Sequence, residues 1–292
     1  MVGAGFSLNS QPLPGVKSRF PTWRQLVWSM FDELYPTVGN ETPIALEDRI
    51  RRFDGIDALR LASEYEAAFG PRKLECLIRN LNPDSEHIPS KLHSLLLQLP
   101  WRDVFTTNYD TLLERTEIAG RAYQPVTVIG DLTLASQPRI VKLHGSLPSQ
   151  TPFIITEEDY RTYPRRFAPF VNTVQQALIE NCLVMVGFSG DDPNFLQWIG
   201  WIRDHLGQHH APIYLVGPLS LSIAQRTLLD RRGVSPIDLS PVFSGYNPAA
   251  GIHAASLDWF LKSLLVSKPQ RPEKWTQTES VAEVESVGTP PL

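Results

Sequence analysis

Four short segments of the sequence carry residue types that could hold a phosphate-bearing ligand and act on it. The first is GAGFS, residues 3–7. A glycine-rich turn lets backbone N–H groups approach a pyrophosphate, and the hydroxyl of Ser7 can add a further donor. A simple tight turn explains the same residues equally well. Only Met1 and Val2 precede this turn, so the usual preceding strand is nearly absent, which leaves open whether the N-terminus is truncated.

Two further segments each follow a short apolar run that is typical of a buried strand. TTNYD, residues 106–110, comes directly after DVF, and its Asn108 and Asp110 could contact a ligand or could cap a helix formed by TLLERT. LHGS, residues 143–146, comes after RIVK. We expect its His144 to be exposed at a strand end, where it would titrate near neutral pH. An ordinary surface histidine is the alternative.

The fourth segment is VGFSGDDPNF, residues 186–195. Gly187 and Ser189 lie in a second glycine turn that suits a nucleotide. Asp192 followed by Pro193 predicts a helix start, which gives Asp192 a structural role as the cap. The remaining histidines have no strand-end context, and we expect them to be structural or solvated: His87, His93, His205, His209, His210 and His253.

Composition excludes several classes of protein. The 292 residues carry 27 basic and 31 acidic side chains, a net charge of −4, so we expect no direct contact with nucleic acid or an anionic membrane. The apolar run at residues 182–188 is too short to span a bilayer, and the N-terminus does not resemble a secretory signal. Cys76 and Cys182 alone cannot form a disulfide framework or a cysteine-rich zinc site. We therefore expect a cytoplasmic protein without zinc.

These segments must be positioned by a sheet. Short apolar runs recur from about residue 101: DVFTTN, RIVKLHG, PFIIT, CLVMVGFSG and PIYLVG. Segments with helical signals lie between or after them: TLLERT, RFAPFVNTVQQALIEN, NFLQWIGWIRDHL, SIAQRTLLDRRG and AASLDWFLKSLL. The alternation predicts an α/β fold, a Rossmann-like open parallel sheet with helices on both faces, in which ligands sit at the carboxyl ends of the strands.

A helical insertion lobe is predicted within this fold, at about residues 22–100. Thr22 can cap a helix that begins TWRQLV, residues 47–70 carry a helical pattern that stops at Gly70, and residues 87–99 carry another that ends before Pro100. We expect residues 1–265 to form one domain. Residues 266–292 lack apolar periodicity and predict a linker or disordered tail.

The four segments, in this order, resemble the motifs of the sirtuin family. GAGFS resembles its GAG-x-S phosphate turn, TTNYD its T-Q-N-x-D motif, LHGS its catalytic HG motif and GFS its later G-T-S turn. The match is closer to the bacterial sirtuin-like branch of antiphage defence systems, in which TTNYDTLLE, KLHGS, ITEEDYRTY and VGFSGDDPNF resemble recurring companions. The resemblance covers roughly residues 1–265 and implies an NAD-binding domain.

Two departures from the typical deacylases bear on the activity that the resemblance implies. Those enzymes carry a four-cysteine zinc module, whereas this chain has two cysteines far apart. Their glycine turn is followed by G-I-P-D-F-R, which LPGVKSRFPTW replaces here. Binding of a peptide substrate is therefore in doubt, while the features of the NAD pocket are retained.

The resemblance also implies roles for individual residues. Asn108 would orient the attacking water or the ribose hydroxyls, and His144 would be the general base, since its ordinary pKa suits work near pH 7. Asp110 would support the loop or bind the ribose. The residues expected to bind NAD are Gly3, Ala4, Gly5, Ser7, Thr107, Asp110, Gly187 and Ser189.

The function expected from these features is cleavage of the nicotinamide–ribose bond of NAD, by an NAD hydrolase that depletes NAD in antiphage defence. A protein deacylase or ADP-ribosyltransferase is one alternative, and a non-catalytic nucleotide-sensing module is another. We expect a homo-oligomer, a partner protein or a fused domain to trigger the activity, because an unrestrained NAD hydrolase would be toxic to its host. The sequence leaves open the trigger, and whether the product is linear or cyclic ADP-ribose.

Overall fold

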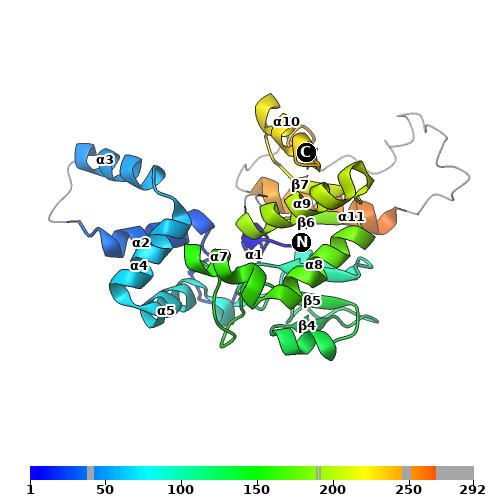
Figure 1. Cartoon of the computed structure of the whole chain (residues 1–292), viewed down its shortest axis with the longest axis horizontal. Helices are drawn as coiled ribbons and strands as arrows, with labels where there is room; N and C mark the ends of the chain where they lie inside the picture. The colour runs from blue at the N-terminus through cyan, green and yellow to red at the C-terminus, as the bar shows by residue number, and fades with distance from the viewer. Residues whose placement is uncertain (38–42, 189, 191, 245–250, 268–292) are drawn as a thin grey trace, which may run out of the picture.

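The computed structural model describes residues 1–37, 43–188, 190, 192–244 and 251–267. Its centre is a parallel sheet made of two three-stranded halves, ordered β4-β5-β3 and β6-β7-β8 (Figure 1). The strands are β3 (Asp103–Thr106), β4 (Gln124–Val126), β5 (Arg139–Lys142), β6 (Leu183–Val186), β7 (Ile213–Gly217) and β8 (Val234–Asp238).

The N-terminal segment joins the two halves. Val2 forms parallel bridges with Thr106 of β3 and with Val186 of β6. Its N–H donates to the carbonyl of Phe105 at 2.8 Å, and the N–H of Val186 donates to the carbonyl of Met1 at 3.0 Å. The two residues before the glycine turn therefore occupy the central position of the sheet, in the order β4-β5-β3-Val2-β6-β7-β8. In open α/β sheets ligands bind where the strand order reverses, and the glycine turn leaves the sheet at this point.

Helices cover both faces of the sheet, which confirms the predicted fold class. On one face, α7 (Glu157–Arg166), α8 (Ala168–Glu180) and α9 (Pro193–Leu206) bury a cluster that includes Tyr163, Phe170 and Trp198. On the other, α6 (Lys91–Gln98) packs with α11 (Ile252–Val266), and both join the four-residue α1 (Ala4–Ser7) in a second cluster. A further helix, α10 (Ile223–Arg231), packs on β8.

A separate group of helices forms a lobe with its own core, at the left of Figure 1. It comprises α2 (Trp23–Leu34), α3 (Pro43–Asp54), α4 (Ala58–Phe69) and α5 (Pro71–Leu81). The short antiparallel pair β1 (Gln11–Pro12) and β2 (His87–Ile88) links the chain that enters the lobe to the chain that leaves it. Tyr109, Phe153 and Ile155 from the sheet side complete the core of this lobe. The lobe therefore rests on the loops that follow β3 and β5.

Several predicted helix ends are confirmed. Thr22 caps α2 in a reciprocal capping box with Gln25, and Gly70 ends α4 with a φ of 85°. Pro193 is the first residue of α9, and the side chain of Asp192 accepts a hydrogen bond from the N–H of Phe195. Within the described ranges, no helix is long and apolar enough to cross a membrane.

Three of the predicted elements are wrong. Residues 47–70 form two helices, because Asp57 caps a new helix by accepting from the N–H groups of Leu59 and Arg60. TLLERT forms turns, since six residues are too few to nucleate a stable helix and Asp84 binds the N–H of Thr111 at 2.8 Å. PFIIT is buried but forms no strand, because Pro152 has no N–H to donate to a ladder.

Two strands of the sheet, β4 and β8, were not predicted. Their sequences are QPV and VSPID, and each contains a proline. Proline within an apolar run normally argues against a strand, but it is tolerated at a sheet edge, where its missing N–H breaks no ladder. Both strands lie at the two edges of this sheet.

Candidate active site

The carboxyl ends of β3 and β5 bring two of the predicted motifs to one edge of the sheet. The two strands are paired in register, with Thr106 opposite Lys142, so TTNYD and LHGS begin side by side. The loops stay together beyond the strands: the N–H of Leu143 donates to Thr106 at 2.9 Å and that of Leu147 to Tyr109 at 2.7 Å. Because β3 also neighbours Val2, the GAGFS turn leaves the sheet at the same edge.

Ser7, Asn108 and Asp110 form a buried hydrogen-bonded triplet at this edge. The Ser7 hydroxyl donates to Asp110 Oδ2 at 2.7 Å and accepts from Asn108 Nδ2 at 2.9 Å. Asn108 Nδ2 also donates to the carbonyl of Gly3 at 3.1 Å. The structure thus places together three of the predicted site residues, of which Ser7 lies 101 positions from Asn108 and 103 from Asp110 in the chain.

This triplet fixes the orientation of the Asn108 amide. The carbonyl of Gly3 can only accept, so the nitrogen must face it and Oδ1 must face the other way. Oδ1 is buried, and among the described residues it has no hydrogen-bond partner. A buried acceptor without a partner is costly, and such atoms are rare outside functional sites. Oδ1 is therefore available to a hydroxyl or a water.

The two glycine turns pack backbone against backbone. The N–H of Gly3 donates to Val186 at 3.1 Å, and that of Gly5 donates to Gly187 at 2.9 Å. Gly187 has a φ of 60°, and a Cβ there would lie 2.3 Å from the nitrogen of Phe6; one on Gly3 would lie 2.5 Å from the carbonyl of Gly187. Glycine is required at these positions for close packing, whether or not a phosphate is bound.

The remaining residues predicted to bind NAD are placed as follows. Ala4 and Gly5 are exposed on the turn, and Thr107 is partly buried at the start of the loop. Ser189 lies outside the described residues. The N–H groups of Gly3 and Gly5 are engaged within the protein, so their contribution to a phosphate site would come from the shape of the turn. Their assignment to NAD remains a prediction.

His144 is buried, which corrects the expectation that it lies exposed at a strand end, and Asn108 is buried as well. Only 3% of His144 and 7% of Asn108 is accessible. Residues of α7 and α9 pack against the His144 ring, and the GAGFS turn binds the Asn108 amide. Burial lowers the pKa of His144 below its ordinary value, and the carboxylates of Asp192 and Asp159 oppose that shift in part. The imidazole is therefore held in its neutral form, the state that a general base needs.

The surroundings of His144 include residues that the sequence did not single out as site residues. Asn194 Nδ2 lies 3.2 Å from His144 Nε2, and Asp192 Oδ2 lies 4.0 Å from the same atom. Tyr160 and Tyr163 of α7 contact the imidazole edge to face, with ring centroids 5.5 and 5.8 Å away. These side chains belong to the segments ITEEDYRTY and VGFSGDDPNF, whose resemblance to the family was the one feature of the sequence that could have indicated them.

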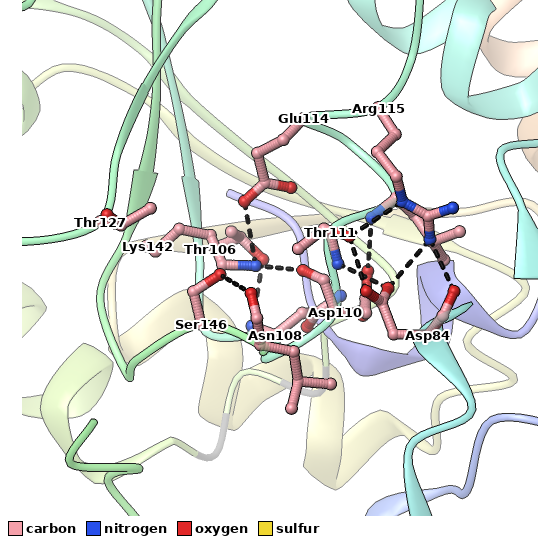
Figure 2. A network of polar contacts seen from close by, with 12 residues as sticks. Asp84, Thr106, Asn108, Asp110, Thr111, Glu114, Arg115, Thr127, Lys142 and Ser146 are labelled. Atoms are coloured by element: carbon pink, nitrogen blue, oxygen red, sulfur yellow. Dashed lines mark hydrogen bonds and ion pairs between the residues drawn. The ribbon is translucent and has the colours of Figure 1, made fainter. Parts of the chain in front are cut away.

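A buried lysine supports the loop that carries Asn108 and Asp110 (Figure 2). The ammonium of Lys142, the last residue of β5, contacts the backbone carbonyl of Asp110 and lies 3.1 Å from Glu114 Oε1. Its side chain is fully buried. Burial raises the pKa of Glu114, while the Lys142 charge opposes that shift. The pair joins KLHGS to TTNYDTLLE, and no motif in the sequence singled it out.

The described residues contain no cluster of histidine, cysteine or acidic side chains that could hold a metal ion. Cys76 and Cys182 are both exposed and unpaired. A cleft of about 360 Å³ opens at the opposite, amino-terminal end of the strands, where its charged side chains pair with one another as Arg102–Glu180 and Arg139–Asp103. The predicted motifs lie away from that cleft.

Comparison with known proteins places this arrangement in a family. Residues 102–237 match the model of the SIR2-like domain. A protein of Acinetobacter baumannii named NAD(+) hydrolase ThsA is 30% identical over 205 residues, which cover 68% of this chain and 39% of that protein. Proteins of the same name from Enterococcus faecium and Bacillus cereus are 30% and 28% identical over 134 and 107 residues, covering 44% and 35% of this chain and 28% and 22% of their own lengths.

The matched region thus spans less than half of each of these relatives. The match to the family model runs from β3 to all but the last residue of β8 and therefore includes both the TTNYD and the LHGS loops. The chain carries a SIR2-like domain, which confirms the sirtuin-like family predicted from four short motifs.

Proposed function

We propose that this domain is an NAD hydrolase, which cleaves the nicotinamide–ribose bond of NAD to give nicotinamide and ADP-ribose. The observation that carries the proposal is the buried Oδ1 of Asn108, which no described residue engages in a hydrogen bond. It is held in a fixed orientation beside Ser7 on the sheet edge that also carries His144. The relatives named NAD(+) hydrolase support the choice of NAD as the substrate.

NAD would enter this edge with its pyrophosphate toward the two glycine turns and its nicotinamide ribose toward Asn108. Within residues 3–7, Ala4 and Gly5 are exposed and would meet the ligand. Asp110 is already bound by Ser7 and by the N–H of Leu112, so its main part is to hold the loop. A ribose hydroxyl can donate a hydrogen bond, and the buried Oδ1 of Asn108 can accept it.

The reaction would break the C1′–N1 bond and form a C1′–O bond. The bonding electron pair goes to the ring nitrogen, so nicotinamide leaves as a neutral molecule. Water attacks C1′ of the ribose, and its proton passes to the neutral imidazole of His144. Asn108 Oδ1 would accept a hydrogen bond from that water or from a ribose hydroxyl and so fix the approach.

Restraint of the activity is part of the proposal. The side chains of Asn108 and His144 are nearly inaccessible in this structure, so the residues packed around them must move before NAD can reach them. We propose that self-association, a partner protein or a further domain favours the open site, and that the restrained enzyme serves as an NAD-depleting effector of antiphage defence in the cytoplasm. NAD loss per protomer across a concentration series, with particle size measured in parallel, tests this restraint. Full turnover by a strict monomer at every concentration would contradict it.

The direct test of the proposed function is to incubate the purified protein with NAD and to identify the products by chromatography. Nicotinamide and ADP-ribose in equal amounts are expected. Detection of cyclic ADP-ribose would show that the adenine ring, and not water, attacks the ribose. An assay with acyl-lysine peptide runs in parallel. Peptide-dependent release of nicotinamide would indicate a deacylase instead.

A further inference from the structure

Asn194, the second residue of α9, is buried against the imidazole of His144. Only 2% of it is exposed, and its Nδ2 lies 3.2 Å from His144 Nε2. A buried amide must be hydrogen-bonded to offset the cost of removing it from water. The contact joins positions 50 residues apart, from different elements, on the ring that would carry the base.

Asp192 is held just outside that contact. Its Oδ1 accepts from the N–H of Phe195 at 3.0 Å as the cap of α9, and its Oδ2 accepts from the hydroxyl of Tyr160 at 3.1 Å. Burial and the Asp192 charge raise the pKa of Tyr160, so this hydroxyl stays protonated and keeps donating. Oδ2 remains 4.0 Å from His144 Nε2, beyond hydrogen-bonding distance. The ring has a neutral partner in contact and a charged one farther away.

A neutral amide suits a ring that must gain and lose a proton. Asn194 can donate from Nδ2 to a bare Nε2, and after a half-turn of its amide it can accept at Oδ1 from Nε2–H. The second arrangement leaves the lone pair on Nδ1, which no described residue engages in a hydrogen bond, free to take a proton from water. A carboxylate in the same place could only accept, and it would favour the charged imidazolium over the neutral base.

We propose that Asn194 is a positioning residue for the general base: its amide holds the His144 ring through Nε2 and leaves Nδ1 to meet the attacking water. This role rests on the proposed function, because it acts through the base that NAD cleavage requires. The other titratable groups of this neighbourhood are Asp159, Tyr160 and Tyr163 of α7, Asp192 before α9 and Tyr109 of the loop after β3.

Two substitutions of Asn194 test its hydrogen bond and its neutrality separately. Asn194→Leu keeps the branched shape at a somewhat larger volume and removes the hydrogen bond. The kcat for NAD should fall roughly 10- to 100-fold, a part of the 10²–10⁴ that a positioned base supplies, with little change in KM. Asn194→Asp keeps the shape and adds a charge; the acidic limb of the kcat/KM profile should move to higher pH. Asn172→Leu, on the exposed face of α8, is the matched control and should leave both parameters unchanged.

A readout without NAD keeps the proposal independent of turnover. In protein labelled with ¹⁵N-histidine, the His144 signals are assigned by their loss in His144→Ala. Asn194→Leu should change the tautomer ratio of the ring, and Asn194→Asp should raise its titration midpoint. Unchanged ring signals in a folded Asn194→Leu protein, or an unmoved midpoint in Asn194→Asp should the leucine variant fail to fold, would overturn the proposal.

The two proposals fail in different ways. If the wild-type protein releases no nicotinamide at any concentration, NAD hydrolysis by this chain without a partner fails, and the ring signals still decide the role of Asn194. If the wild type cleaves NAD and Asn194→Leu does so at the same rate, the positioning role alone fails. Asp192→Asn gives a further comparison. If it shifts the pH profile more than Asn194→Asp does, Asp192 is the dominant partner of His144, and the proposal is overturned.

Discussion

The hydroxyl of Ser7 donates a 2.7 Å hydrogen bond to the carboxylate of Asp110, 103 residues further along the chain. The same hydroxyl accepts from Asn108 Nδ2, so one oxygen links the glycine turn to the loop after β3. Ser7 thereby sets the position of the amide that would face the substrate. The serine of the motif has a structural task here besides any contact with a phosphate.

Ser7→Ala should destabilise the protein and weaken catalysis together. The change leaves the buried Asp110 Oδ2 without its donor and removes one of the two acceptors of Asn108 Nδ2, which costs about 1–3 kcal/mol. Urea unfolding measures the free energy, and nicotinamide release measures the activity. Ser29→Ala, whose hydroxyl only bonds the preceding turn of α2, is the control. Equal unfolding free energies for Ser7→Ala and the wild type would show that the triplet carries no stability.

Asn108→Ala and His144→Ala should each reduce NAD cleavage by roughly 100-fold or more, because they remove the positioned acceptor and the base. Since both side chains are buried, some loss of thermal stability accompanies the loss of activity. Circular dichroism at the assay temperature checks that the variants are folded. His253→Ala, exposed on α11, should match the wild type. A folded His144→Ala protein with normal turnover would remove His144 from the mechanism.

Lys142→Met should destabilise the fold by about 3–5 kcal/mol, because it leaves the buried carboxylate of Glu114 without its countercharge. Adding Glu114→Leu should recover much of that loss, since a buried apolar pair has no charge to desolvate. The double-mutant cycle is read from urea unfolding. Strictly additive effects of the two changes would mean that the pair does not interact.

Stability should fall as the pH drops below about 6.5, the unfolded-state value for histidine. Burial lowers the pKa of His93 to about 4 and lowers that of His144 as well. Between the folded and unfolded values the unfolded chain binds more protons, so acid favours unfolding and stability rises with pH through this window. His93→Leu should flatten part of the slope of unfolding free energy against pH between 6.5 and 4. An unchanged slope would show that His93 is not the group responsible.

Gly187→Ala should destabilise the protein by more than about 1 kcal/mol, because φ is positive there. The added Cβ would also lie 2.3 Å from the nitrogen of Phe6, where the two glycine turns meet. Gly200→Ala is the matched control: this glycine lies inside α9 with open space around a Cβ, so the change should stabilise the protein by roughly 0.5–1 kcal/mol. The melting temperature of Gly187→Ala should lie below that of the wild type, and that of Gly200→Ala above it. The reverse order would contradict the packing of the turns.

Helix ends and buried strands could be predicted from the sequence where residues close together in the chain determine them. The helix cap at Thr22 and the proline start of α9 were predicted because each is completed within three residues. Four buried strands were predicted because continuous apolar runs suit a sheet covered on both faces. The two edge strands and the fate of PFIIT depended on which segment lies beside them, which the local pattern does not encode.

The order of four motifs was enough to predict the family, since each motif keeps its own short signature. The tertiary structure decided how they meet. Whether His144 is exposed or buried depends on α7 and α9, whose residues Tyr160, Tyr163 and Asn194 pack against its ring from elsewhere in the chain. The partners of His144, Asn108 and Lys142 likewise come from other segments, because parallel pairing and crossover helices bring distant residues to one sheet edge. Burial and contact across the chain, and so the protonation of the base, follow from that packing and not from spacing along the sequence.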